Sequence, residues 1–197
     1  MTRIDAINNR TKVLDAAREV FGEQGLGAEV KAIAQQAGVG VGTLYRSFPR
    51  KDDLILELLR EKISHYNTLL QEAEAQDNPI AGLRILLAGT FTIHSEYWFL
   101  VEPMVTRQLS PELLKEFEGQ AGIWPARALL RRAINLGYLR PDLDVETAAA
   151  MISGTMLPWI ERQLKNSHDP VTLANNIVDL FLMGAAAEKG AQVLSVR

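Results

Sequence analysis

Apolar residues recur every three or four positions along most of the chain, which is the spacing of one face of an α-helix. The first helical stretch has its apolar face at Val13, Leu14, Ala17, Val20 and Phe21. Asn8 or Asn9 is expected to cap its beginning, and residues 25–27, Gly-Leu-Gly, its end. No stretch alternates apolar and polar residues as a half-buried strand does. The sequence therefore predicts an all-α fold.

The other periodic stretches predict two short helices, one long helix and a series of later ones. The short helices are expected over about residues 30–37 and 41–48. The long helix begins after Pro49, at Lys51, and continues to about Gln76 with one apolar stripe. Turns rich in Gly, Pro and Asp separate the later helices, which are expected over residues 79–95, 97–108, 111–119, 122–137, 144–165 and 170–188.

Two short helices joined by a glycine-containing turn and braced by a longer helix describe a helix-turn-helix. Ala34 and Ala37 are small enough to let the two short helices approach closely, and Val39 and Leu44 can fill the wedge between them. A helix that enters the major groove needs short side chains near its beginning, followed by hydrogen-bonding groups. The outward side of the second short helix offers such a set: Val41, Gly42, Thr43, Tyr45, Arg46 and Ser47.

Residues 33–54, IAQQAGVGVGTLYRSFPRKDDL, closely resemble a family signature that runs roughly I-A-x-x-A-G-V-S-x-G-T-L-Y-x-H/Y-F-x-x-K-x-x-L. This is the signature of the tetracycline-repressor (TetR) family of transcriptional regulators, and residues 13–25 are similar to that family's first helix. The resemblance covers about residues 9–60; the rest is similar only in helical character and length. It implies a three-helix helix-turn-helix domain over residues 1–52 and a helical ligand-binding and dimerisation domain over residues 53–197.

The resemblance also implies which residues face DNA. Thr43, Tyr45 and Arg46 would lie against the duplex, and Tyr45 and Lys51 would contact phosphates. The assignment of Lys51 to a phosphate has a physical basis, because a lysine beside the free amides of a helix N-terminus attracts an anion. The residues assigned to the DNA interface are Lys31, Val41, Gly42, Thr43, Tyr45, Arg46 and Lys51.

Two departures of the sequence from the family pattern matter for DNA binding. Ala28-Glu29 stands where the family commonly has Thr or Ser, and Glu29 would repel a phosphate if it faced DNA. Whether a contact to the DNA backbone is lost there stays open. Gly40 stands where a capping Ser is usual, and glycine is an acceptable helix cap at small cost.

Charge and composition narrow the function classes. Residues 1–51 hold 8 Lys/Arg and 5 Asp/Glu, whereas residues 52–197 hold 13 and 19, so a basic end precedes an acidic body, as in a protein whose first part binds nucleic acid. The absence of cysteine excludes disulfides and thiolate chemistry. Neither His65 nor His168 has a partner at metal-ligand spacing, and no G-x-S-x-G elbow occurs. No cofactor, metal or enzymatic activity is expected.

The part after the helix-turn-helix is rich in aromatic residues and methionine, which favours a largely hydrophobic ligand. His94, with Glu102 or Arg107, would supply polar contacts. The same residues pack ordinary cores equally well, so core packing stays an alternative for each of them. The residues assigned to a ligand pocket are Phe91, His94, Trp98, Phe99, Met104, Phe117, Trp124, Met151 and Trp159.

The last two long helices carry small residues at 148–154 and 184–187 together with apolar ones, as an obligate interface requires. The residues assigned to a homodimer interface are Ile152, Met156, Ile160, Ile177, Leu180, Phe181 and Gly184, with intramolecular core as the alternative. Two-fold symmetry would make the double-stranded operator DNA near-palindromic.

Together these features predict a repressor released from its operator by a small, largely hydrophobic ligand, with the helix that begins at Lys51 as the lever between domains. The alternative is a helical ligand carrier or interaction protein with a degenerate helix-turn-helix, which Glu29 favours. The chain start has no apolar stretch behind its basic residue, and no apolar segment reaches the roughly 20 residues that span a bilayer. A cytoplasmic location without membrane contact is expected.

Overall fold

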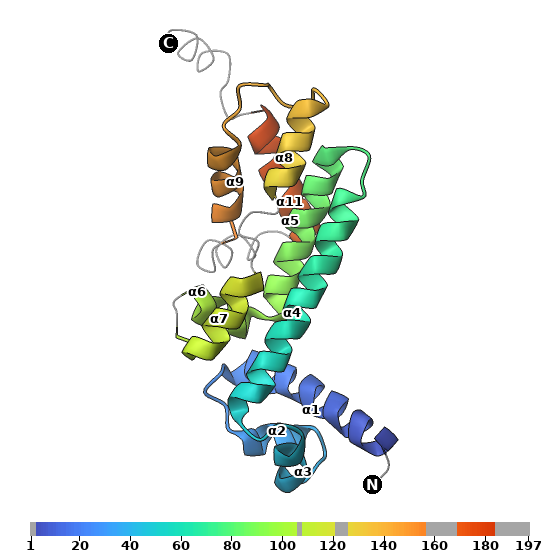
Figure 1. Ribbon diagram of the computed structural model, residues 1–197, viewed down its shortest axis with the longest axis vertical. Helices are drawn as coiled ribbons and strands as arrows, with labels where there is room; N and C mark the ends of the chain where they lie inside the picture. The colour runs from blue at the N-terminus through green and yellow to red at the C-terminus, as the bar shows by residue number, and fades with distance from the viewer. Residues whose placement is uncertain (1–2, 106–107, 121–125, 157–168, 184–197) are drawn as a thin grey trace. The chain divides into compact units, whose positions relative to one another are not determined.

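The computed structural model describes residues 3–105, 108–120, 126–156 and 169–183 (Figure 1). These residues are α-helices joined by turns, and no strand occurs among them. The predicted all-α fold is therefore confirmed for the described part of the chain.

The chain divides into two compact units. The first comprises Met1–Thr68 and Thr92–Ile123, and the second comprises Leu69–Phe91 and Trp124–Arg197. This division reflects packing, whereas the predicted boundary after residue 52 separates functions, so that boundary stays a prediction.

Each unit is built from helices of its own and from parts of two helices that both units share. The long helices α4 (Lys51–Glu74) and α5 (Pro79–Glu96) contribute residues to both units. The other helices of the first unit are α1 (Arg3–Gln24), α2 (Val30–Gln36), α3 (Val41–Ser47), α6 (Trp98–Val105) and α7 (Pro111–Gln120). Those of the second unit are α8 (Ala126–Asn135), α9 (Val145–Gly154) and α11 (Pro170–Met183).

The core of the first unit consists of the apolar stripes that the sequence spacing predicts. Side chains from α1, α2, α3 and α4 meet there and are almost completely removed from solvent, and they include Val13, Ala17, Phe21, Ile33, Leu44, Phe48, Leu54 and Leu58. The helix-turn-helix is thus braced by α1 and α4.

In the second unit, two glycines bring α5 close to α4. A Cβ atom placed on Gly82 would lie 2.3 Å from the carbonyl oxygen of Ala73, and one placed on Gly89 would lie 2.3 Å from a methyl carbon of Leu69. Real Cβ contacts do not occur at such distances. At Gly82 the neighbouring atom is backbone and cannot move aside, so this approach of the two helices requires glycine there, whereas the Leu69 side chain beside Gly89 can shift.

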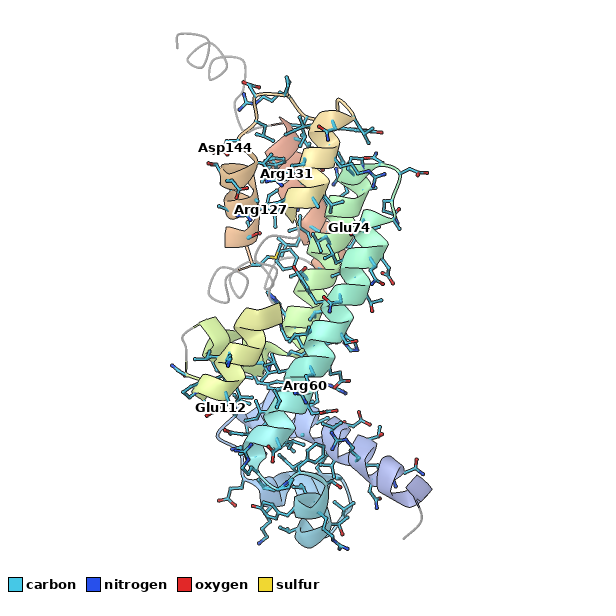
Figure 2. The ribbon with its side chains drawn as sticks, viewed as in Figure 1. Arg60, Glu74, Glu112, Arg127, Arg131 and Asp144 are labelled. Carbon is cyan, nitrogen blue, oxygen red and sulfur yellow. The ribbon has the colours of Figure 1, made fainter. Side chains whose placement is uncertain are left out.

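Arginines of α8 connect this helix to α4 and α9 within the second unit. Arg132 of α8 donates to the carbonyl oxygens of Glu74 and Gln76 at 2.9 and 2.8 Å, so it satisfies the exposed end of α4. Arg127 and Arg131, which also lie on α8 and are labelled in Figure 2, both pair with Glu146 of α9.

The first helix begins earlier than predicted. α1 starts at Arg3, so the prediction that Asn8 or Asn9 caps it is wrong, and both asparagines lie inside the helix. The residues before them, Arg-Ile-Asp-Ala-Ile, include good helix formers, and an asparagine within a helix costs less than about 1 kcal/mol. Tertiary packing of the following stripe outweighs that cost.

The helix predicted over residues 144–165 is also different in the structure. Asp144 caps it as N-cap, accepting from the amide of Glu146 at 3.1 Å, but α9 ends at Gly154 and a turn follows at Thr155 and Met156. Glycine has a low helix propensity, and the Thr155 hydroxyl donates to the Ile152 carbonyl at 2.6 Å, which competes with continued helix bonding. Residues 157–165 lie outside the described part.

Candidate nucleic-acid interface

The turn between α2 and α3 depends on Gly38. Its φ of +66° lies in the left-handed region, which residues with a side chain adopt at a cost. The amide of Val39 then reaches back to the Ala34 carbonyl at 3.0 Å, which satisfies an end carbonyl of α2. This closed turn sets the direction in which α3 leaves α2.

The third helix has one buried and one exposed side. Leu44 and Phe48 are each 2% exposed, whereas Tyr45 is 46% and Val41 39% exposed. Gly42 and Arg46 are also exposed, and Thr43 is partly so. The outward face therefore carries the side chains that the sequence assigns to DNA.

Arg46 folds back along the helix on which it lies. Its Nε donates to the carbonyl oxygen of Gly42 at 3.1 Å, and its Nη2 donates to the hydroxyl oxygen of Thr43 at 3.2 Å. Sequence patterns did not predict this link between two candidate DNA-contacting residues. An i,i+3 spacing on a helix is the signal that could have found it.

The start of α3 is capped by backbone alone. Gly40 has an extended conformation and no side chain to bond the first amides, and its carbonyl accepts from the amides of Thr43 and Leu44 at 2.8 and 3.1 Å. The start of α2 is similar, because Glu29 makes no side-chain cap bond and its side chain is exposed.

Lys51 joins three parts of the helix-turn-helix domain. Its Nζ donates to the carbonyl oxygen of Ala28 at 2.7 Å and lies 5.6 Å from the centroid of the Phe21 ring. An ammonium group has three donors, so the bond to Ala28 leaves donors available for a phosphate. The predicted role of Lys51 and this structural role are compatible.

Arg10 holds the other end of α3, and sequence reasoning missed it. It donates to the Ser47 carbonyl at 3.3 Å, pairs with Glu57 of α4 at 3.0 Å and lies 4.4 Å from the centroid of the Phe48 ring. A cation at the end of a helix complements its exposed carbonyls. Its partners are 37 to 47 positions away in sequence, so no local pattern predicts these contacts.

Aromatic residues fasten the helix-turn-helix to α6 within the first unit. The indole nitrogen of Trp98 donates to the Gly22 carbonyl at 3.1 Å, and the rings of Phe21 and Phe99 lie with their centroids 5.8 Å apart. Both the hydrogen bond of Trp98 and the ring contact of Phe99 involve the last turns of α1. Movement of α6 would therefore act on the helix that supports α2 and α3.

A charged cluster lies beside these aromatics. Arg18 of α1 donates to a carboxylate oxygen of Glu61 of α4 at 2.6 Å, and its guanidinium lies 5.8 Å from the centroid of the Tyr97 ring. Burial lowers the pKa of Arg18, but the bond to Glu61 outweighs this and holds the pKa above its ordinary value. Burial and the Glu61 charge raise the pKa of Tyr97 to about 12. The cluster therefore disfavours the ionised form of Tyr97.

The residues assigned to a ligand pocket have varied surroundings. Phe91 and Phe99 are fully buried, His94 is half-buried, Trp98 is 43% exposed and Met151 is 67% exposed. The contacts of Phe99 with Phe21 are those of a core residue, the alternative that the sequence left open. The side chains of Met104 and Phe117, and all of Trp124 and Trp159, lie outside what the structure describes. The pocket stays a prediction.

The residues assigned to a dimer interface also differ in their exposure to solvent. Leu180 is 62% exposed, and Met156, Ile177 and Phe181 are half-buried. Ile152 is 3% exposed, so the protomer itself already buries it. Ile160 and Gly184 lie outside the described residues. The interface stays a prediction that Leu180 supports most directly.

No group of three His, Asp or Glu side chains in the described residues is arranged to hold a metal ion. No helix among them has the length and apolar character to span a membrane.

The chain is similar to known transcriptional regulators. Residues 13–58 match the family described as bacterial regulatory proteins, tetR family. The fatty acid metabolism regulator protein of Bacillus subtilis is 30% identical over 189 residues, which cover 88% of this chain and 93% of that protein. The transcriptional repressor KstR2 of Mycobacterium tuberculosis H37Rv is 28% identical over 174 residues, 84% of this chain and 85% of that protein.

A solved structure gives the same result. The transcriptional regulator FadR from Bacillus subtilis in complex with stearoyl-CoA superposes with a TM-score of 0.66 at 26% identity, covering 89% of this chain and 99% of that one. The likeness therefore extends beyond the helix-turn-helix to almost the whole chain.

Proposed function

Because the chain belongs to the tetR family of bacterial regulatory proteins and is a DNA-binding transcriptional regulator, we propose that it represses genes and leaves its operator when a hydrophobic effector binds. The observation that carries the DNA-binding part is the exposed face of α3, with Tyr45 and Arg46 outward and Leu44 and Phe48 inward. The similar proteins are transcriptional regulators, which favours this function over the alternative of a ligand carrier with a degenerate helix-turn-helix.

In this proposal α3 enters the major groove. Thr43 and Arg46 lie toward the bases, and Tyr45 and Lys51 contact phosphates on either side of them. Lys31, which is exposed on α2, is the further cationic residue assigned to the interface. Phosphate contacts position a protein on DNA and base contacts select the sequence, so the two sets have separable effects.

The proposed effector is a fatty acyl thioester of coenzyme A. The B. subtilis FadR structure contains stearoyl-CoA, and the B. subtilis relative that matches 88% of this chain is a fatty acid metabolism regulator. The apolar and aromatic residues assigned to the pocket suit an acyl chain. The effector acts only to the extent that it binds the DNA-free conformation more tightly than the DNA-bound one.

The functional form is proposed to be a homodimer acting in the cytoplasm without enzymatic activity. Leu180 is a large apolar side chain that the protomer leaves exposed, as expected of a residue that a second copy covers. Two copies related by a two-fold axis would present two α3 helices to a near-palindromic operator.

A gel shift with the DNA upstream of the protein's own gene tests the proposal. We expect a shifted band at or below about 1 μM protein, a loss of affinity as salt rises, and release by stearoyl-CoA but not by free coenzyme A. A duplex of scrambled sequence is the control. Equal affinity for both duplexes would contradict a specific regulator, and a shift that acyl-CoA leaves unchanged would contradict this effector.

A further inference from the structure

The guanidinium group of Arg46 is held in one orientation by its own helix. A guanidinium is planar and carries five N–H donors in a fixed arrangement. The side edge, formed by Nε and Nη2, bonds the Gly42 carbonyl and the Thr43 hydroxyl oxygen at 3.1 and 3.2 Å. The end edge, formed by Nη1 and Nη2, lies about 120° from the side edge in the guanidinium plane. Arg46 itself is exposed on α3.

The hydroxyl group of Thr43 is the second acceptor that orients the Arg46 guanidinium. Elsewhere in the described part, Thr68 and Thr90 donate their hydroxyl protons to carbonyls four residues earlier, at 3.2 and 2.6 Å. The Thr43 hydroxyl instead accepts a hydrogen bond from Arg46. A Cβ atom at position 40 would lie 4.0 Å from this oxygen, so Gly40 leaves the space beside the hydroxyl open.

The end edge of Arg46 thus offers two parallel donors at the exposed face of α3. In the major groove, guanine presents two adjacent acceptors, O6 and N7, whereas adenine pairs one acceptor with a donor and cytosine presents a donor. Two parallel donors match guanine alone among the four bases.

We propose that Arg46, held by Gly42 and Thr43, selects a guanine in each operator half-site through the end edge of its guanidinium. Thr43 acts here as a positioning residue. The inference rests on the proposed function and adds to it the base that the recognition helix selects. Position 46 falls at a variable place of the family signature, so the selection belongs to this chain.

The first test is selection of bound duplexes from a random DNA library with the full chain and three variants. The wild-type consensus is expected to carry one guanine per half-site that disappears with Arg46→Met. Thr43→Val, which keeps the shape but loses the hydroxyl, should weaken the preference for that guanine, and Thr43→Ser should restore it. An unchanged consensus with Arg46→Met would overturn the inference.

The second test changes single atoms of the selected guanine. Replacing it with 7-deazaguanine removes the N7 acceptor and should weaken wild-type binding about 10-fold. Hypoxanthine keeps O6 and N7 and should have no effect, which makes it the matched control. Arg46→Met should bind the normal and 7-deaza duplexes equally, and a full penalty in that variant would contradict the contact.

These outcomes distinguish a failure of the guanine contact from a failure of the proposed function. Enrichment of a sequence without any dependence on position 46 would overturn the guanine contact and leave the proposed function standing. Failure to enrich any sequence would overturn both.

Discussion

Three cationic side chains of the helix-turn-helix domain bond backbone groups of the domain itself. Arg10, Lys51 and Arg46 each donate to a backbone carbonyl of the domain, those of Ser47, Ala28 and Gly42. Such bonds restrict long side chains before binding and so reduce the entropy lost when DNA binds. At the residue scale, the interface is organised before its partner arrives.

Tyr97 allows a pH test of the cluster at α1 and α4. Its pKa is raised to about 12 by burial and by the Glu61 charge, so the folded protein holds this proton more tightly than the unfolded chain does. The resulting stabilisation is complete below pH 10 and is lost as pH rises from 10 toward 12. Urea unfolding should show a larger fall in unfolding free energy between pH 9 and 11 for wild type than for Tyr97→Phe. Parallel falls would contradict this environment.

At the element scale, the helices that position the interface follow from local chemistry. The turn before α3 was predictable because Gly38 stands between two periodic stretches and within a family signature. The start of α1 was not, because asparagine caps helices and also fits within them, and packing decided the outcome. The contacts of Arg10 and Arg18 join residues 37 to 47 positions apart, which a single sequence does not relate to one another. The candidate DNA face was predictable, whereas the bonds that hold it in place were not.

The approach of α4 and α5 depends on glycine and can be tested directly. Gly82→Ala would place a methyl group against the fixed carbonyl of Ala73, 2.3 Å away. The helices must then shift, and we expect a loss of about 1–3 kcal/mol in unfolding free energy, measured with urea. Gly22→Ala in α1 is the matched control, because nothing lies within 4 Å of the added methyl group. That change should be neutral or stabilise by about 0.5–1 kcal/mol. Equal effects of the two substitutions would contradict the close packing.

At the scale of the whole molecule, regulation requires that effector and DNA compete through the protein's conformation. α4 contributes to both compact units, and α6 is bonded to the last turns of α1 through Trp98. These are the connections through which we expect an effector to act on α3. The predicted role of α4 as a lever remains a prediction.

Thermodynamic linkage makes this regulation measurable in two directions. Coupling of about 1–3 kcal/mol would weaken operator binding about 5- to 150-fold when the effector is saturating. Saturating operator must then weaken the binding of stearoyl-CoA by the same factor. Calorimetric titration of stearoyl-CoA with and without operator duplex measures it. Identical dissociation constants would show that the ligand site and the DNA site are not coupled.

The central claim is that α3 docks on DNA with Tyr45 and Lys51 on phosphates, and fluorescence anisotropy with labelled upstream DNA tests it most directly. The measurement compares wild type with the double variant Tyr45→Phe, Lys51→Ala over a salt series. We predict that the variant binds specific and scrambled duplexes more weakly by a similar factor, and that the slope of log affinity against log salt falls by about 1, the contribution of one lost ammonium contact. Unchanged affinity and slope at moderate salt would contradict the docking.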